Sequence, residues 1–209
     1  MARTPLSPAT DNNTMAEKST RDHIVEAADR LFYENGYAYT SFADIADAVQ
    51  ISRGNFYYHF KTKDEILDAV IALRLANTQA MLDQWERAGA NPTARIRSFI
   101  NMLVANQALI MQFGCPVGTL CTELAKLNHG SKEQATLLFA LFRGWLRKQF
   151  EALGHTADAD ALATHLLARS QGVATLANAF GDESFVRQEV QQMHAWLDRC
   201  QVRKGRRRA

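Results

Sequence analysis

Residues 41–60, with the sequence SFADIADAVQISRGNFYYHF, constrain the fold most, because they predict two short helices joined by a tight turn. Ser41 is followed three residues later by Asp44, a pattern typical of a helix start whose exposed amides are capped. Ser52 is a second signal of the same kind. Apolar residues recur at helical spacing along the first helix, at Phe42, Ile45, Ala46 and Val49.

The second helix has two faces of different character. Phe56 and Phe60 are four residues apart and share one face, while Arg53, Tyr57 and Lys61 share another. A helix with an apolar stripe, polar groups at its start and aromatic hydroxyls beside them suits the DNA major groove. A helical hairpin that packs in a core and turns an ordinary polar face to solvent would show the same pattern. This stretch alone does not separate the two interpretations.

The segment from about Ser19 to Lys63 resembles the DNA-binding domain of TetR-type (tetracycline-repressor-like) transcriptional regulators. It covers about a quarter of the chain, and the remainder resembles the family only in being helical and of the right length. The matching positions are Ile24, Ala27, Ala28, Leu31, Phe32, Gly36, Thr40, Ile45, Ala46, the run Ser52-Arg53-Gly54-Asn55-Phe56-Tyr57-Tyr58-His59-Phe60, and Lys63.

One position departs from the family pattern, which usually has glycine where this chain has Gln50. If Gln50 adopts a left-handed conformation at the end of the first helix, the strain is about 1 kcal/mol. The turn can instead take another path. The departure therefore concerns the geometry of the turn and not the presence of the motif.

Composition and periodicity predict an all-α fold. The chain has 209 residues, of which 47% are hydrophobic and 22% charged, with four prolines and eleven glycines. Helical periodicity between Gly and Pro breaks predicts a three-helix N-terminal domain and a larger helical domain. The expected divisions are a disordered arm over 1–16, a helix-turn-helix domain over 17–63, an effector-binding and dimerisation domain over 64–202 and a basic tail over 203–209.

The expected helices after the N-terminal domain differ in how clearly their ends are marked. Thr62 and Glu65 predict a capping box, Asn91-Pro92 a helix start, and Ser131 with Gln134 another cap. The helices are expected over about 63–88, 92–112, 118–127, 132–153, 158–180 and 182–200.

The cysteines and the apolar runs indicate the cellular compartment of the protein. Cys115, Cys121 and Cys200 are an odd number without paired spacing, which fits a reducing cytoplasm. The first fourteen residues are polar, so no secretory signal is expected, and we expect no apolar run that reaches the ~20 residues of a membrane span. We expect a cytoplasmic protein without a membrane partner.

Charge gives only local support for nucleic-acid binding. The net charge is +2, and residues 16–63 hold six Lys and Arg against seven Asp and Glu. The cluster of Arg53, His59, Lys61 and Lys63 therefore carries the electrostatic argument.

Individual roles in DNA binding follow partly from chemistry. Arg53 is the best donor to a guanine edge, because its planar fork can reach O6 and N7 together. Gly54 permits close approach of the backbone. Asn55 can contact a base or cap the helix. The resemblance implies a DNA-binding set of Thr40, Ser41, Ser52, Arg53, Gly54, Asn55, Tyr57, Tyr58, His59, Lys61 and Lys63. Within this set it implies phosphate contacts by Thr40, Ser41, Tyr57, Tyr58, His59 and Lys63. The alternative for Tyr58 is packing against the first helix.

The resemblance also implies an effector cavity and a two-fold dimer in the C-terminal domain. Large apolar residues there can equally be ordinary core. The candidate effector-binding residues are Phe99, Met102, Met111, Phe113, Cys115, Cys121, Phe142 and Trp145. The candidate dimer interface consists of stripes on the last two helices, Leu162, Leu166, Arg169, Gly172, Val173, Leu176, Val186, Val190, Met193 and Leu197, although burial within the subunit is the alternative.

Cys115 has its own hypothesis. It lies in the turn-rich stretch 113–118 just before a helix start, where the helix dipole can make a thiol more reactive. A Gly-Cys in this loop also resembles one in electrophile-sensing members of the family. Alternatively, Cys115 is an inert apolar side chain, and Gly114 and Pro116 only shape the loop.

These observations together predict a homodimeric transcriptional repressor that binds double-stranded operator DNA and is released by a small-molecule effector. The alternatives are a helical interaction module that does not bind DNA, and a thiol-based sensor acting through Cys115. No Gly-rich phosphate loop, Cys-x-x-Cys pair or His-x-x-x-His pair is present. We therefore expect no enzyme activity, no cofactor and no metal.

Overall fold

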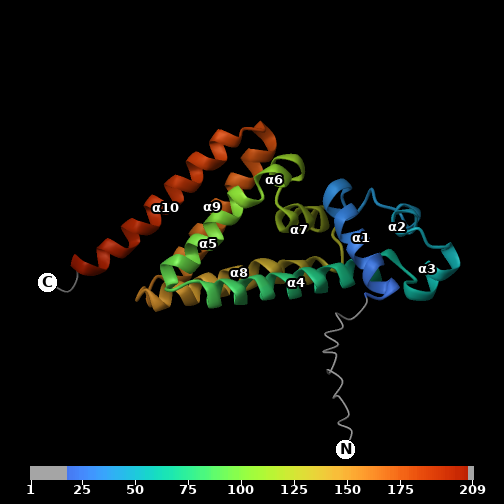
Figure 1. The fold of residues 1–209 in the computed structure, drawn as a ribbon, viewed down its shortest axis with the longest axis horizontal. Coiled ribbons are helices and arrows are strands. Elements are labelled where there is room, and N and C mark those ends of the chain that lie inside the picture. Colours follow the sequence, from blue (N-terminus) through green and yellow to red (C-terminus); the bar gives the residue numbers. More distant parts are fainter. Residues whose placement is uncertain (1–17, 207–209) are drawn as a thin grey trace, which may run out of the picture.

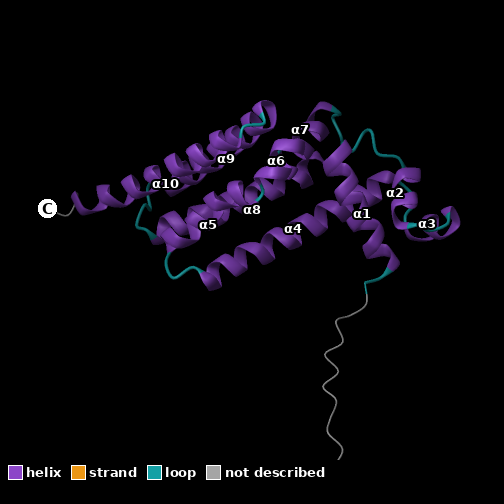
Figure 2. Cartoon of the chain, turned by 45° about the horizontal axis from the view of Figure 1, so that its top comes forward, coloured by secondary structure: helices purple, strands orange, loops and turns teal. Residues whose placement is uncertain are grey.

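The computed structural model describes residues 18–206, and over this range the chain forms helices joined by short turns, without a β-strand (Figures 1 and 2). The predicted arm over 1–16 and residues 207–209 of the predicted tail lie outside the described residues. The helices are α1 (Thr20–Asn35), α2 (Phe42–Val49), α3 (Arg53–His59), α4 (Lys63–Ala88), α5 (Pro92–Ala105), α6 (Gln107–Phe113), α7 (Pro116–Lys126), α8 (Lys132–Ala152), α9 (Ala159–Phe180) and α10 (Glu183–Arg206).

The helices enclose two hydrophobic cores. The smaller core joins α1, α2 and α3 to the first turns of α4, and it also receives Leu120 and Leu124 from α7. The larger core is built from the rest of α4 and from α5, α6, α8, α9 and α10. Figure 1 shows α2 and α3 at one end of the molecule and the end of α10 at the other, with α4 running beside α8 between them. The domain boundary at residue 63 stays a prediction, and the smaller core continues past it to Ile71.

Local capping explains where the first two helices begin, and the cap at Ser41 was predicted. Ser19 and Asp22 cap α1 reciprocally, and Ser41 and Asp44 cap α2 in the same way. Gln50 ends α2 in the left-handed region, at φ 56° and ψ 39°. Because Gln50 is left-handed, it carries the strain of about 1 kcal/mol that was expected for this conformation.

Two predicted helix boundaries and one predicted cap were wrong. The expected single helix over 92–112 is divided at Asn106, whose backbone leaves the helical conformation at φ −109° and ψ 14° and whose side-chain amide donates to the carbonyl of Met102. Helix α7 begins at Pro116 and not near Gly118, with Cys115 as its N-cap. Ser131 does not cap α8, because its hydroxyl donates to Asp68 of α4 at 2.8 Å.

The segment Gln107–Lys126 is long and apolar enough, by length and composition, to cross a membrane, which the sequence interpretation had not found. In the structure it is two helices, α6 and α7, broken at Gly114 and Cys115. Its Glu123 accepts hydrogen bonds from the turn after α1. The segment is therefore a folded part of both cores and not a continuous span.

The predicted dimer stripes are mostly internal. Six of their apolar side chains are at most 6% exposed and belong to the larger core: Leu166, Val173, Val186, Val190, Met193 and Leu197. Burial within the subunit, the alternative interpretation, is correct for these six. Gly172 and Leu176 remain exposed, and Leu162 and Arg169 are half-buried.

Candidate functional site

Helix α3 is held firmly although it has only seven residues. The Ser52 hydroxyl caps it by accepting from the Asn55 amide at 3.3 Å. Phe56 and Phe60 are each 1% exposed and anchor its inner face. The ring of Phe42 on α2 meets Phe56 edge-on at 5.2 Å and stacks on Tyr57 at 5.6 Å. The short helix is therefore positioned by aromatic packing against α2.

The outer face of α3 is polar and open to solvent. The exposed residues include most of the predicted DNA-binding set: Ser41, Ser52, Arg53, Gly54, Asn55, Tyr57, Tyr58 and Lys61. Tyr58 is 79% exposed, which argues against its packing on the first helix. A Cβ built on Gly54 would meet nothing within 4 Å, so another molecule can approach this backbone closely. His59 is half-buried.

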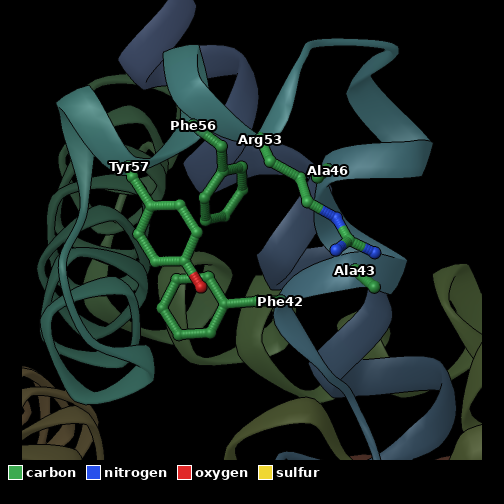
Figure 3. Close-up of a pocket in the computed structure, with 6 residues that line it drawn as sticks. All are labelled: Phe42, Ala43, Ala46, Arg53, Phe56 and Tyr57. Atoms are coloured by element: carbon green, nitrogen blue, oxygen red, sulfur yellow. The ribbon is translucent and has the colours of Figure 1, made fainter.

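Arg53 lies at the rim of a recess of about 190 Å³ between α2 and α3. Figure 3 shows its side chain extending toward Ala43 and Ala46 of α2, and the ring of Tyr57 beside that of Phe42. Within the described part of the chain, Arg53 makes no hydrogen bond or ion pair. Its guanidinium is therefore available to an external acceptor.

Two predicted phosphate contacts do not fit the structure. Thr40 is 1% exposed, and its hydroxyl donates to the Gly36 carbonyl at 2.8 Å, so its side chain is turned inward. Lys63 points at the same turn: its Nζ donates to the carbonyls of Tyr37 and Thr40 at 2.9 and 3.1 Å and lies 4.3 Å from the Tyr37 ring centroid. In this conformation Lys63 ties α4 to the α1–α2 turn.

That turn is also tied to α7, through a residue that the sequence interpretation missed. The Glu123 carboxylate accepts from the amides of Tyr37 and Ala38 at 2.9 and 2.8 Å. Gly36, at φ +90°, allows this approach, since a Cβ there would lie 3.2 Å from a Glu123 oxygen. The signal that the sequence offered was that Glu123 is the single carboxylate in Pro116–Lys126.

Tyr37 completes the junction. Its hydroxyl donates to Asp64 at 2.6 Å and lies 3.2 Å from His129 Nε2. Burial, followed by the hydrogen bond to Asp64, raises the pKa of Tyr37, and the same hydrogen bond lowers the pKa of Asp64. The turn before α2 is thus linked to α4, to α7 and to the α7–α8 connection.

A chamber of about 250 Å³ lies in the C-terminal half, bordered by α4, α5, α6, α8, α9 and the start of α7. Four predicted effector residues line it: Phe99, Met102, Cys115 and Phe142. The sequence interpretation missed several polar lining residues, including Tyr33, Thr78, Asn106, Ser170 and Gln171. They come from α1, α4, α9 and the junction of α5 with α6, which are far apart in sequence, so no local pattern marks them.

The other four predicted effector residues do not line the chamber. Trp145 is 7% exposed and packs on Trp85, with ring centroids 5.7 Å apart. Phe113 meets Tyr33 edge-on at 5.4 Å, and Met111 packs against the larger core. Cys121 packs against the smaller core, where burial raises its pKa to about 11.

Contacts at the start of α7 join the chamber wall to α1. Tyr33 of α1 donates its hydroxyl to the carbonyls of Gly114 and Leu109 at 2.8 and 3.1 Å. Burial raises the Tyr33 pKa to about 12. Arg74 of α4, 9% exposed, donates to the Asp29 carboxylate at 2.5 Å and to the Pro116 carbonyl at 2.6 Å. Helix α7 is thus fastened to the N-terminal helices at both of its ends.

The described residues contain no group of three or more His, Cys, Asp or Glu side chains placed to hold a metal ion.

Comparison with known proteins identifies the N-terminal region. Residues 24–70 match the model of the bacterial regulatory proteins of the tetR family. This N-terminal region of the chain therefore belongs to the TetR family. TetR-family proteins are DNA-binding transcriptional regulators of the helix-turn-helix type and not enzymes.

The similarity to TetR-family relatives extends beyond that region. An uncharacterised regulator in the lacX 3′ region of Lactococcus lactis subsp. lactis is 29% identical over 138 residues, 65% of this chain and 70% of that one. The repressor DhaR of Mycobacterium sp. (strain GP1) is 28% identical over 134 residues, 64% of this chain and 65% of its own length. A TetR regulator from Legionella pneumophila has the same fold, with a TM-score of 0.77 and 24% identity over 88% of this chain and 98% of that one.

Proposed function

We propose that this TetR-family regulator is a cytoplasmic homodimeric repressor that binds operator DNA through α3 and leaves it when a small molecule occupies the chamber. One observation carries the DNA-binding part: α3 has Phe56 and Phe60 buried while its polar start and its tyrosine hydroxyls face solvent. A helix held in this way can enter a major groove without unfolding its own support.

The exposed residues take different roles in this proposal. Arg53 reads a guanine edge, because it is exposed and has no partner among the described residues. The backbone amide of Asn55 donates to the Ser52 hydroxyl and so takes part in the cap, while its side chain is exposed. The side chain can therefore contact a neighbouring base. Tyr57, Tyr58 and Lys61 hold phosphates, which positions the helix without reading sequence.

Helix α7 supplies a path from the chamber to α3. Its first turn borders the chamber at Cys115, Pro116 and Val117. Its far end holds the α1–α2 turn through Glu123. A chamber occupant that shifts α7 therefore acts directly on the turn that precedes α2 and α3. Arg74 and Tyr33 hold the near end in the arrangement described here.

The dimer uses the outward face of α9 in this proposal. Leu176 is 42% and Phe180 is 66% exposed, and Gly172 has open space where a Cβ would be. Ala168 is exposed one turn before Gly172. Small residues let two helices approach closely, and the larger side chains at the end of α9 supply apolar contact. Leu176→Glu is expected to give monomers by light scattering, whereas Leu127→Glu, a similarly exposed leucine after α7, leaves the dimer intact.

A mobility shift with the DNA flanking the protein's own gene tests DNA binding. Wild-type protein is expected to shift a specific fragment, with affinity falling as salt rises. Arg53→Ala should cost about 1–3 kcal/mol and relax preference at one base pair, while Lys61→Ala should weaken all sequences alike. Lys126→Ala, on α7, is the matched control for loss of a positive charge. If neither α3-region variant differs from wild type, α3 does not contact DNA, and a helical interaction module becomes the better interpretation.

Cys115 supports a second candidate function, a thiol-based sensor. Its Sγ lies 3.5 Å from the Gly118 amide at the start of α7, and the residue borders both the chamber and an open groove beside it. In this candidate the thiolate adds to a quinone ring carbon, and the resulting bulk displaces α7. Release from DNA by a quinone should be lost in Cys115→Ser and kept in Cys121→Ser. Equal release in Cys115→Ser leaves a reversible ligand as the signal.

A further inference from the structure

The chamber between α4, α5, α6, α8 and α9 differs from the rest of the molecule in the chemistry of its wall. Most of the wall is apolar, including Phe99, Met102 and Phe142. None of the described residues that line it is Asp, Glu, Lys, Arg or His. Burying an unpaired ion in such surroundings costs far more than burying a neutral group. The wall therefore selects against charge.

The polar atoms of the wall are few, and several are already occupied. The Tyr33 hydroxyl donates to two backbone carbonyls, and the Ser170 hydroxyl donates to Leu167. Asn106 uses its amide group on Met102, which leaves its carbonyl oxygen. Neither the Thr78 hydroxyl nor the Gln171 side-chain amide makes a hydrogen bond to the described residues. The wall thus offers a few neutral donors and acceptors to an occupant.

The start of α7 is the one feature of the wall that could favour an anion, because helix N-termini attract negative charge. Here Pro116 has no N–H, and the Gly118 N–H points at the Cys115 sulfur. This helix start therefore presents fewer free amides than usual, and no basic side chain lines the chamber beside it.

Size gives a second limit. A cavity of about 150 Å³ lined by apolar side chains holds one benzene molecule. By that measure 250 Å³ suits a molecule of roughly ten non-hydrogen atoms, two fused rings for example. The chamber shares Cys115, Phe139 and Gln171 with an open groove beside α7, so a solute can reach it from the surface.

From the wall and the volume we infer that the chamber binds an uncharged, mainly apolar molecule of about two rings with one hydroxyl or carbonyl group, and excludes ions of the same shape. This inference rests on the proposed effector-binding function and names its ligand class. Asn106, Thr78 and Gln171 supply the hydrogen bond, and the aromatic and methionine side chains supply the apolar contact.

Three probes of one shape test the inference by isothermal titration calorimetry at pH 7 without DNA. 1-Naphthol is neutral, 1-naphthoate is an anion and 1-naphthylmethylammonium is a cation. We expect 1-naphthol to bind with a dissociation constant on the order of 10 μM and both ions at least thirtyfold more weakly. Equal binding of either ion, or binding of none of the three, overturns the inference.

Variants place the binding in the chamber. Val117→Phe adds bulk at the first turn of α7 and should weaken 1-naphthol at least tenfold, whereas Thr122→Ala, which faces the groove, should leave it unchanged. If circular dichroism shows that Val117→Phe is unfolded, Ala174→Leu fills the chamber from α9. Unchanged binding in a folded chamber-filling variant places the probe elsewhere and overturns the inference. No step involves DNA, so failure here leaves operator binding untouched, and failure of operator binding leaves this result standing.

Discussion

The α2–α3 pair and the chamber differ in how sequence determines them. Helices α2 and α3 are fixed by contacts close in sequence: a cap three residues away, a turn residue at Gln50, and aromatic rings within one short stretch. The chamber is bordered by segments from Tyr33 to Ala174, none of which specifies it alone. One region depends on local chemistry and the other on which helices the topology brings together.

The two regions also differ in packing, which gives the largest expected effect. Phe56→Ala removes a side chain that is 1% exposed in the smaller core, and we expect a loss of about 4 kcal/mol in the free energy of unfolding. Phe142→Ala should cost about 2 kcal/mol, because part of that ring already borders empty space and has fewer contacts to lose. Urea unfolding followed by circular dichroism measures both. Equal losses would contradict the difference in packing.

The link between the two regions gives the next effect. Glu123→Ala removes two charge-assisted hydrogen bonds to the amides of Tyr37 and Ala38, and we expect a loss of about 2 kcal/mol in stability. The variant should also respond less to a chamber occupant in DNA binding. Thr122→Ala, exposed on the same helix, is the control. If Glu123→Ala unfolds like Thr122→Ala and responds like wild type, α7 does not transmit the signal.

Gln50 offers a smaller and opposite effect. Gln50→Gly removes the cost of a side chain at φ 56°, and we expect a gain of about 0.5–1 kcal/mol, reduced by the greater freedom of glycine in the unfolded chain. Thermal unfolding with Gln50→Ala as control measures it, since alanine keeps the Cβ and should not stabilise. A loss of stability in Gln50→Gly would show that the glutamine side chain contributes more than the left-handed conformation costs.

These effects parallel what the sequence allowed us to predict. The caps at Ser41 and Ser52, the end of α2 and the burial of Phe56 and Phe60 follow from residues close in sequence, and they were predicted. The inward position of six residues in the dimer stripes was not, because an apolar stripe does not say whether its own subunit or a second copy covers it. Trp145 and Cys121 failed as chamber residues for the same reason: their helices turn them toward other neighbours.

Lys63 was misplaced for a related reason. A lysine at a helix start beside a DNA-binding motif suggests a phosphate contact, but the carbonyls of Tyr37 and Thr40 converge on it from a turn more than twenty residues earlier. Every residue has a backbone carbonyl, so the sequence does not indicate which carbonyls converge on a lysine, and this arrangement cannot be predicted without the fold. The same holds for Glu123, whose partners are backbone amides.

The smallest expected effect concerns pH and the hydrogen bond between Tyr37 and Asp64. The pKa of Asp64 is lowered in the folded state, so its contribution is present above its unfolded pKa of about 4 and is lost as pH falls through the folded value. The pKa of Tyr37 is raised, so its contribution is present below its unfolded pKa of about 10 and is lost as pH rises further.

One substitution should therefore flatten both limbs of the stability profile. Tyr37→Phe removes the titrating hydroxyl and, with it, the hydrogen bond that lowers the pKa of Asp64. Stability should therefore fall less steeply below pH ~4 and above pH ~10, from a lower plateau between them. Tyr39→Phe, two residues away and 87% exposed, should keep the wild-type profile. Urea midpoints across the pH range measure the difference. If Tyr37→Phe keeps both slopes, the junction of the α1–α2 turn with α4 does not depend on this hydrogen bond, and Glu123 and Lys63 are its main supports.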